Sequence, residues 1–250
     1  MSRIITLFNQ CGGVGKSTLT MNLGYALANR SHRVLLVDLD PQASLTTFMG
    51  LEPTELKATI YNSLLEDWKL PILTSIHKMD LVPTNINLSV AELELISALN
   101  RESRLKNALN PVTFEYEYIL VDCPPSLGLL SILGLTAATH LLVPIETEFK
   151  SYFGTGLLLD TVQRVKTHVN QNLKIAGFVP MKFDKRRSQH TRTLEQIHRE
   201  LSPLGTIFPA VPDSTLFSDA TEVRKPLACY KSKHPGIQVL SEIAIGLEKL

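Results

Sequence analysis

The chain alternates short apolar runs with longer segments in which apolar residues recur at helical spacing. The run at 33–37 is almost wholly apolar, as expected of a strand buried on both faces of a parallel sheet. Within 16–30, Leu19, Leu23 and Leu27 fall on one face of a predicted helix. The same patterns predict further strands at 3–8, 80–83, 118–121, 140–143, 174–179 and 206–208, and further helices at 52–67, 89–107, 127–138, 155–168, 192–201 and 235–250.

Strands that alternate with helices of this length indicate right-handed β-α-β units. The predicted fold class is therefore α/β, with a doubly wound, mostly parallel sheet and helices on both faces. No repeat, low-complexity tract or linker interrupts the pattern, so we expect one domain over residues 1–250. Ligands of such sheets bind beyond the carboxyl ends of the strands, and the informative residues of this chain follow its predicted strands.

A glycine-rich loop follows the first predicted strand and leads directly into a helix. Its glycines permit tight backbone turns with inward-facing amide groups, and the helix N-terminus adds a partial positive charge. Lys16 would supply a full cation to the β- and γ-phosphates, and the Ser17 hydroxyl is placed to bind Mg²⁺. The predicted nucleotide-binding residues of this loop are Cys11, Gly12, Gly13, Val14, Gly15, Lys16, Ser17 and Thr18.

Three carboxylates also end predicted strands. Asp122 closes an apolar strand and precedes Pro124 rather than a helix, so a helix cap is a poor explanation. A Mg²⁺ ligand that acts through a water molecule is a better one. Asp38 and Asp40 are two residues apart and therefore on the same side of the pleat. A carboxylate at a phosphate site can orient the attacking water. Either member of the pair could do so, and both are candidate catalytic residues.

Three segments in order resemble the ParA/MinD family of positioning ATPases. The loop is similar to that family's deviant phosphate loop, K-G-G-x-G-K-[ST]; residues 37–42 (VDLDPQ) resemble its first switch, and 119–128 (ILVDCPPSLG) resemble its Walker B strand and second switch. The resemblance covers nearly the whole chain. It implies a P-loop ATPase that uses ATP and Mg²⁺ and forms a homodimer with two nucleotides sandwiched at the interface.

Cys11 departs from the family pattern, in which this position holds a signature lysine that reaches the partner's phosphates across the dimer. A thiol cannot supply that charge. Lys150, a few residues beyond the strand at 140–143, is the proposed replacement, because residues 144–149 resemble the segment that lines the dimer interface. The alternative is a solvated lysine that neutralises Glu146 and Glu148.

Loss of the signature lysine together with Lys150 resembles the branch of the family that positions carboxysomes. That branch is understood to dimerise on nucleoid DNA and to be released by a small cargo-bound adaptor that stimulates hydrolysis. A plasmid or chromosome partition ATPase is the alternative within the family. From another class, a small-molecule ligase of the dethiobiotin-synthetase type would share the fold and the loop.

The two halves of the chain differ in charge. Residues 1–150 carry 11 Lys and Arg against 15 Asp and Glu, whereas residues 151–250 carry 14 against 9. An anionic partner should therefore meet the second half. By resemblance to nucleoid-binding members, two basic clusters are candidate contacts for double-stranded DNA of any sequence, with solvated loops as the alternative: Lys182, Lys185, Arg186, Arg187 and Arg192, and Arg224, Lys225, Lys231 and Lys233.

Other features narrow the class. Three cysteines without a Cys-x-x-Cys spacing exclude a disulfide framework and a thiolate zinc site, and their positions exclude an iron–sulfur branch of the family. The absence of a signal peptide or a basic terminal helix predicts a cytoplasmic, nucleoid-associated protein without membrane contact. Where relatives place an adenine-binding asparagine this chain has Met181 and Lys182, and Pro212 and Asp213 resemble a second contact to the base.

Overall fold

The fold is built on one eight-stranded sheet with the order β3-β4-β2-β5-β1-β6-β7-β8. It is seen in a computed structural model that describes residues 2–66, 68–148 and 154–250. β3 pairs with β4 in the antiparallel sense, and every other neighbouring pair is parallel. The strands are β1 (Arg3–Leu7), β2 (Val34–Asp38), β3 (Leu73–Ile76), β4 (Met79–Val82), β5 (Tyr118–Asp122), β6 (His140–Glu146), β7 (Lys174–Met181) and β8 (Thr206–Ile207).

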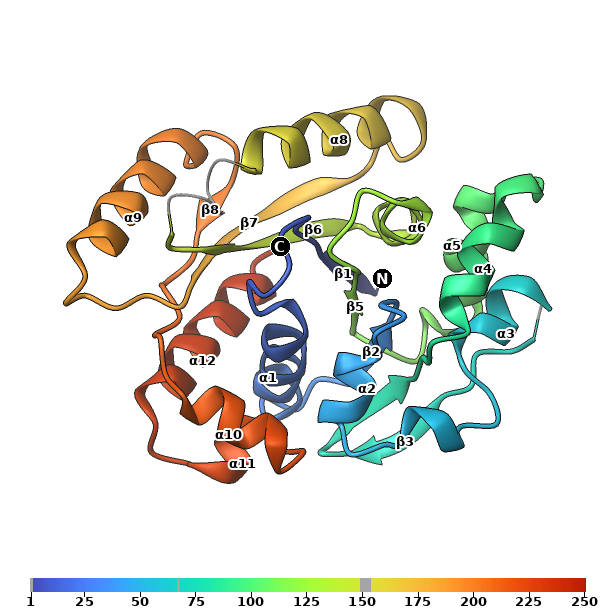
Figure 1. The fold of residues 1–250 in the computed structure, drawn as a ribbon, viewed down its shortest axis with the longest axis horizontal. Helices are drawn as coiled ribbons and strands as arrows, with labels where there is room; N and C mark the ends of the chain where they lie inside the picture. The colour runs from blue at the N-terminus through green and yellow to red at the C-terminus, as the bar shows by residue number, and fades with distance from the viewer. Residues whose placement is uncertain (1, 67, 149–153) are drawn as a thin grey trace.

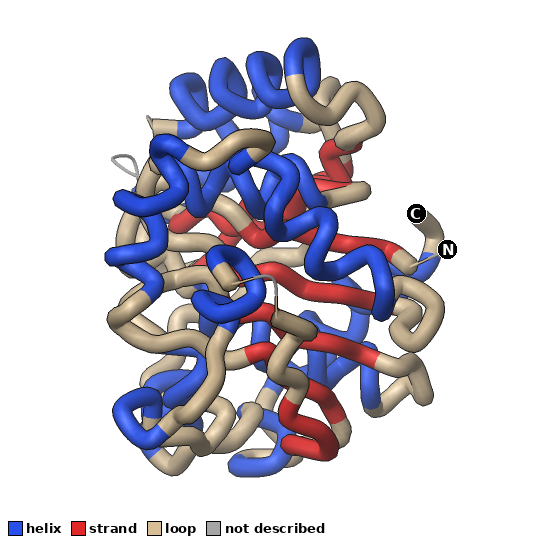
Figure 2. The backbone as a smooth tube through the Cα atoms, turned by 90° about the vertical axis from the view of Figure 1, so that its right-hand side faces the viewer, coloured by secondary structure: helices blue, strands red, loops and turns tan. Residues whose placement is uncertain are grey.

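Helices cover both faces of the sheet, which confirms the predicted fold class (Figure 1). Figure 2 shows the strands stacked between the two helical layers. The α-helices are α1 (Lys16–Ala28), α2 (Ser44–Phe48), α3 (Ile60–Leu65), α4 (Leu88–Glu94), α5 (Arg104–Leu109), α6 (Leu129–Ala137), α8 (Thr155–His168), α9 (Ser188–Leu201), α10 (Leu216–Glu222), α11 (Leu227–Tyr230) and α12 (Pro235–Glu248).

Successive strand residues alternate between two hydrophobic cores. Ile4 and Leu35 pack on the face covered by α3 to α6, α8 and α9, whereas their neighbours Ile5 and Leu36 pack on the face covered by α1 and α12. All five residues of β2 are buried, because the strand lies inside the sheet and has helices on both sides. The apolar sequence of this strand therefore predicted its place correctly.

The carboxyl ends of three adjacent strands meet in register. Asp122, the last residue of β5, pairs with Leu7 at the end of β1 and with Asp38 at the end of β2. The phosphate loop leaves β1 at this edge, so the topology brings the loop and two of the predicted carboxylates together.

Two predicted helices are broken in the structure. The segment predicted at 52–67 forms a 3-10 turn at Pro53–Glu55, and its helix begins only at Ile60, where Thr59 and Asn62 make a capping box. The segment predicted at 89–107 divides into α4 and α5 around Asn100, whose φ of 53° is left-handed. Caps and a left-handed residue interrupt these helices although the apolar spacing continues past them.

Four short elements went unpredicted: α2, β3, α10 and α11. Each has seven residues or fewer, too few for a periodic pattern to stand out. The uncharged stretch at 123–145 is divided between α6 and β6. Within the described ranges, none of the helices is both long enough and apolar enough to cross a membrane.

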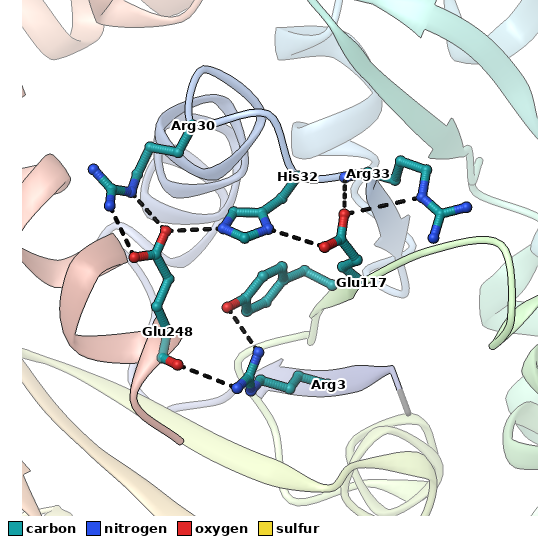
Figure 3. A network of polar contacts seen from close by, with 7 residues as sticks. Arg3, Arg30, His32, Arg33, Glu117 and Glu248 are labelled. Atoms are coloured by element: carbon teal, nitrogen blue, oxygen red, sulfur yellow. Dashed lines mark hydrogen bonds and ion pairs between the residues drawn. The ribbon is translucent and has the colours of Figure 1, made fainter.

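At the amino ends of the strands, a polar network ties the end of the chain to its beginning (Figure 3). Glu248 accepts two hydrogen bonds from Arg30, at 2.6 and 2.8 Å, and lies 2.8 Å from Nε2 of His32. The pKa of Glu248 is lowered to about 2, chiefly by the bonds from Arg30. Arg3 donates to the carbonyl oxygens of Glu248 and Leu250, so the C-terminal helix is docked against β1.

Candidate functional site

The phosphate loop turns sharply between β1 and α1. Gly13 and Gly15 have φ values of 76° and 92°, in the left-handed region that side chains disfavour. Gly15 directly precedes the first residue of α1, so the amide groups of the helix N-terminus open toward the loop. A glycine-rich turn before a helix N-terminus can bind an anion through its backbone amides, and we refer to this turn as the anion cradle.

Lys16 places its ammonium group inside this loop. Its side chain donates to the carbonyl oxygens of Asn9 at 3.0 Å and of Cys11 at 3.1 Å, and the residue is only 6% exposed. Burial lowers the pKa of Lys16, while the nearby carboxylates of Asp122 and Asp40 oppose that shift. A buried cation next to a helix N-terminus is suited to receive the charge of a polyphosphate.

Two side chains tie the loop to β6 and to the residue that precedes α8. Asn9 Nδ2 donates to the Pro144 carbonyl oxygen at 2.7 Å, and Gln10 Nε2 donates to that of Gly154 at 2.7 Å. Gln10 stands where the common phosphate loop has its first glycine, so in this chain the position anchors the loop. Neither contact is predictable from the sequence, because both partners are backbone atoms far along the chain.

Asp122 has an open carboxylate oxygen. Oδ2 is buried and has no hydrogen-bond partner among the described residues, while Oδ1 accepts a long bond from the Thr20 hydroxyl at 3.4 Å. The pKa of Asp122 is raised well above its usual range, first by burial and then by the carboxylate of Asp38, while the Ser17 hydroxyl opposes the shift. An unpartnered buried oxygen beside a hydroxyl fits the oxygen ligands that Mg²⁺ prefers.

Asp38 and Asp40 are in contact, although not as two residues on one side of a pleat, because β2 ends at Asp38 and Asp40 lies beyond it. The backbone N–H of Asp40 donates to Asp38 Oδ1 at 3.1 Å. Asp38 is fully buried, and burial raises its pKa to about 7 although three hydrogen bonds oppose that shift. Asp40 is 8% exposed, and its Oδ1 accepts a bond from the Gln42 N–H at 3.0 Å.

A cavity of about 270 Å³ joins the phosphate loop to the segment after β8. It brings together the three residues predicted at the base, namely Met181, Pro212 and Asp213, with the loop. Met181 reaches the loop itself, since a side-chain carbon placed on Gly15 would lie 3.1 Å from its Cε. The full lining is Gly13, Gly15, Thr18, Met181, Lys182, Val211, Pro212, Asp213, Ser214, Phe217 and Ser218.

Sequence reasoning missed the aromatic wall of this cavity. Phe217 lies on α10, in a stretch where no helix was predicted. Lys182 also lines the cavity, although we placed it among the DNA-binding residues, and its Nζ forms an ion pair with Glu146 at 2.7 Å. The signal in the sequence was the aromatic Phe217 a few positions after Pro212, since an aromatic ring can stack on a nucleotide base.

The rest of the first basic cluster lies around the start of α9 (Figure 1). Lys185, Arg186, Arg187 and Arg192 are exposed. Arg186 makes a two-pronged pair with Asp184, at 2.9 and 2.8 Å, which leaves less of its charge for a partner. The second cluster, comprising Arg224, Lys225, Lys231 and Lys233, is exposed around α11, and Arg224 lies 3.7 Å from Glu52.

Lys150 lies outside the described residues, so the structure leaves its predicted role open. Cys11, whose loss of charge Lys150 was expected to replace, is partly exposed on the phosphate loop, and its N–H donates to Asn9 Oδ1 at 2.9 Å. Within the described ranges, no group of three or more His, Cys, Asp or Glu side chains is arranged to hold a metal ion.

Known proteins are similar in sequence to almost the full length of this chain. The AAA domain family matches residues 2–175. The chain is 36% identical to the sporulation initiation inhibitor protein Soj of Bacillus subtilis, over 98% of this chain and 97% of Soj. It is 37% identical to the chromosome partitioning protein ParA of Myxococcus xanthus, over 99% of this chain and 88% of that protein.

Solved structures share the fold. The cobyrinic acid a,c-diamide synthase of Mycobacterium smegmatis, with bound ADP and magnesium, has a TM-score of 0.88 at 33% identity, and covers 100% of this chain and 95% of its own. The apo McdA of Cyanothece has the same TM-score at 24% identity, with 99% and 100% covered. At that identity the second likeness concerns the fold alone.

Proposed function

Because the chain belongs to the ParA/MinD family of AAA-domain P-loop proteins, we propose that it is a Mg²⁺-dependent ATPase that positions a cargo on DNA. The observation that carries the proposal is the meeting of three features at one sheet edge. These are the anion cradle with Lys16, the open Oδ2 of Asp122, and the Asp38–Asp40 pair.

The nucleotide is proposed to lie between the phosphate loop and the cavity behind it. Backbone amides and Lys16 bind the phosphates, while Phe217 and Met181 contact the base, with Asp213 at its polar edge. The bound ADP, ATP analogue and magnesium of the M. smegmatis structures support this assignment. Ser17 and Asp122 would hold Mg²⁺, which neutralises phosphate charge when it is bound.

We assign the two aspartates of the first switch different tasks. Both oxygens of Asp38 accept hydrogen bonds from the protein, which suits a supporting role. Asp40 is the more exposed, and among the described residues only its Oδ1 accepts a bond, so it can meet and orient an attacking water. Lys16 remains the cation that offsets charge on the transferred phosphoryl group.

The partners follow by family likeness. We propose an ATP-sandwich homodimer, sequence-independent contact with double-stranded DNA through the two basic clusters, and release by a small adaptor protein. The exposure of Lys185, Arg187 and Arg192 supports the DNA contact. Lys182 pairs with Glu146 and lines the cavity, so we propose that it lies near the nucleotide instead. Lys150 stays a proposed cation in trans.

Chromosome or plasmid partition is the cargo function that the relatives favour. Soj and ParA are 36% and 37% identical to this chain over nearly all of it. The carboxysome assignment rests on Cys11 and Lys150, and it stays a prediction.

The proposed role of Lys150 has its own test. Replacing Lys150 by Ala should abolish ATP-dependent dimerisation, and adding Cys11→Lys should restore part of it. Full activity of Lys150→Ala would refute the proposal that Lys150 replaces the signature lysine.

The proposal is tested by ATP turnover and by DNA co-sedimentation with the same preparation. Asp40→Ala should bind ATP but hardly hydrolyse it, and should double in mass by light scattering when ATP and Mg²⁺ are added. Charge reversal of Arg187 and Arg192 should weaken DNA binding and flatten its salt dependence by roughly one unit for each lost phosphate contact. Glu195→Ala, also on α9, serves as the matched control. An Asp40→Ala variant that stays monomeric with ATP contradicts the proposal.

A small-molecule ligase is the second candidate, because one solved neighbour at 33% identity carries the name of a diamide synthase. Such an enzyme would hydrolyse ATP only with its acceptor present and would ignore DNA. Salt-sensitive co-sedimentation with DNA therefore separates the two candidates. The cavity beside the loop, at about 270 Å³, is part of the site in either case and does not separate the two candidates.

A further inference from the structure

We propose that Thr46 is a positioning residue that acts through Asp38 to hold Asp40 in place. The inference rests on the proposed ATPase function and assigns a role to a helix, α2, that sequence patterns did not predict. It is carried by a chain of hydrogen bonds that joins the ends of β4 and β2 to the first switch.

Thr46 makes two bonds to one oxygen of Asp38. Its hydroxyl donates to Oδ2 at 2.7 Å, and its backbone N–H donates to the same oxygen at 2.8 Å. The hydroxyl in turn accepts from the N–H of Thr84 at 3.0 Å. Thr46, Thr84 and Asp38 are all fully buried, so water cannot replace any of these partners.

The direction of these bonds separates two buried carboxylates. β2 lies between β4 and β5, and Asp38 is paired in register with Asp122 of β5. Thr84 follows β4, on the other side of β2, so Thr46 draws Oδ2 of Asp38 away from Asp122. Oδ2 of Asp122 has no hydrogen-bond partner among the described residues.

The remaining oxygen of Asp38 carries the effect onward. Oδ1 accepts the N–H of Asp40 at 3.1 Å, so the backbone of Asp40 is held by a carboxylate that Thr46 has already oriented. If the hydroxyl of Thr46 is lost, the Thr84 N–H has no acceptor and Asp38 loses its shortest bond. Only the backbone N–H of Thr46 then holds Oδ2, so the carboxylate is oriented less firmly and the backbone of Asp40 is held less tightly.

The test compares three variants. Thr46→Val keeps the branched shape and removes the hydroxyl, Thr46→Ser keeps the hydroxyl, and Thr47→Val makes the same change at the next, partly exposed residue of α2. We expect kcat of Thr46→Val to fall about 10- to 100-fold, the range for a hydrogen bond to a charged group, with KM for ATP changed less than about threefold. Thr46→Ser and Thr47→Val should stay within about threefold of the parent kcat.

A second readout does not depend on turnover. In nucleotide-free protein, the amide hydrogen of Asp40 should exchange about tenfold faster in Thr46→Val than in the parent, Thr46→Ser or Thr47→Val, as followed by NMR. Unchanged exchange overturns the inference, and so does a Thr46→Ser variant as impaired as Thr46→Val. If the parent fails to hydrolyse ATP while the exchange result holds, the proposed function fails and the positioning role of Thr46 stands.

Discussion

Replacing Gly134 by Ala tests how tightly α6 is packed behind the nucleotide site. A side-chain carbon at this position would lie 2.5 Å from Sγ of Cys123 and 3.3 Å from Cγ2 of Thr6. Cys123 is fully buried and directly follows Asp122, so the clash falls next to the proposed metal ligand. Gly134 has no room for the new atom unless the strand end moves.

The size of the effect follows from two opposing contributions. Overpacking a core typically costs about 1–3 kcal/mol, whereas replacing glycine by alanine inside a helix gains about 1 kcal/mol. We therefore expect Gly134→Ala to lower the free energy of unfolding by up to about 2 kcal/mol. Because Cys123 must shift, Mg²⁺-dependent nucleotide affinity should fall with it.

A double-mutant cycle isolates the contact. Cys123→Ala removes Sγ, so Gly134→Ala in that background should cost about 1–3 kcal/mol less than in the parent chain, as measured by urea denaturation. Gly156→Ala on α8 is the matched control, because nothing lies within 4 Å of its added carbon. Additive single effects, within about 0.5 kcal/mol, would refute the packing argument.

Three further outcomes are expected. Asn170→Ala should lower the free energy of unfolding, measured by urea denaturation, by about 2–3 kcal/mol, because the buried Asn170 Nδ2 donates to three carbonyl oxygens near the end of α6. The same change at the exposed Asn172 should alter it by less than about 0.5 kcal/mol. Phe217→Ala should weaken ATP binding roughly 5- to 150-fold in fluorescence titration if the aromatic ring stacks on the base, and the exposed Phe114→Ala should leave it unchanged. Without nucleotide, the stability contributed by Asp38 should fall as the pH rises from about 4 to about 7, because its raised pKa means that the folded protein binds this proton more tightly than the unfolded chain; a flat profile over that range in denaturation experiments would contradict this.

Local chemistry determined much of this protein. Glycines with left-handed φ values and a Lys-Ser pair at a helix start specify the phosphate loop within a few residues, and the apolar runs place Asp38 and Asp122 at strand ends. The parallel, doubly wound sheet follows from the alternation of strands and helices. These features are readable because each depends on neighbours in the chain.

The tertiary structure decided how the pieces meet. The hydrogen bonds that orient Asp38 depend on Thr84, which follows the adjacent strand β4 and donates to Thr46. The cavity beside the phosphate loop depends on Phe217, far along the chain from the loop. In the sequence, Lys182 belongs to a basic cluster. In the structure it follows β7 and pairs with Glu146 at the end of the neighbouring strand β6. The break at Asn100 lies inside an unbroken helical spacing. Such contacts depend on which strands become neighbours, a long-range outcome of burying both faces of the sheet that local periodicity does not encode.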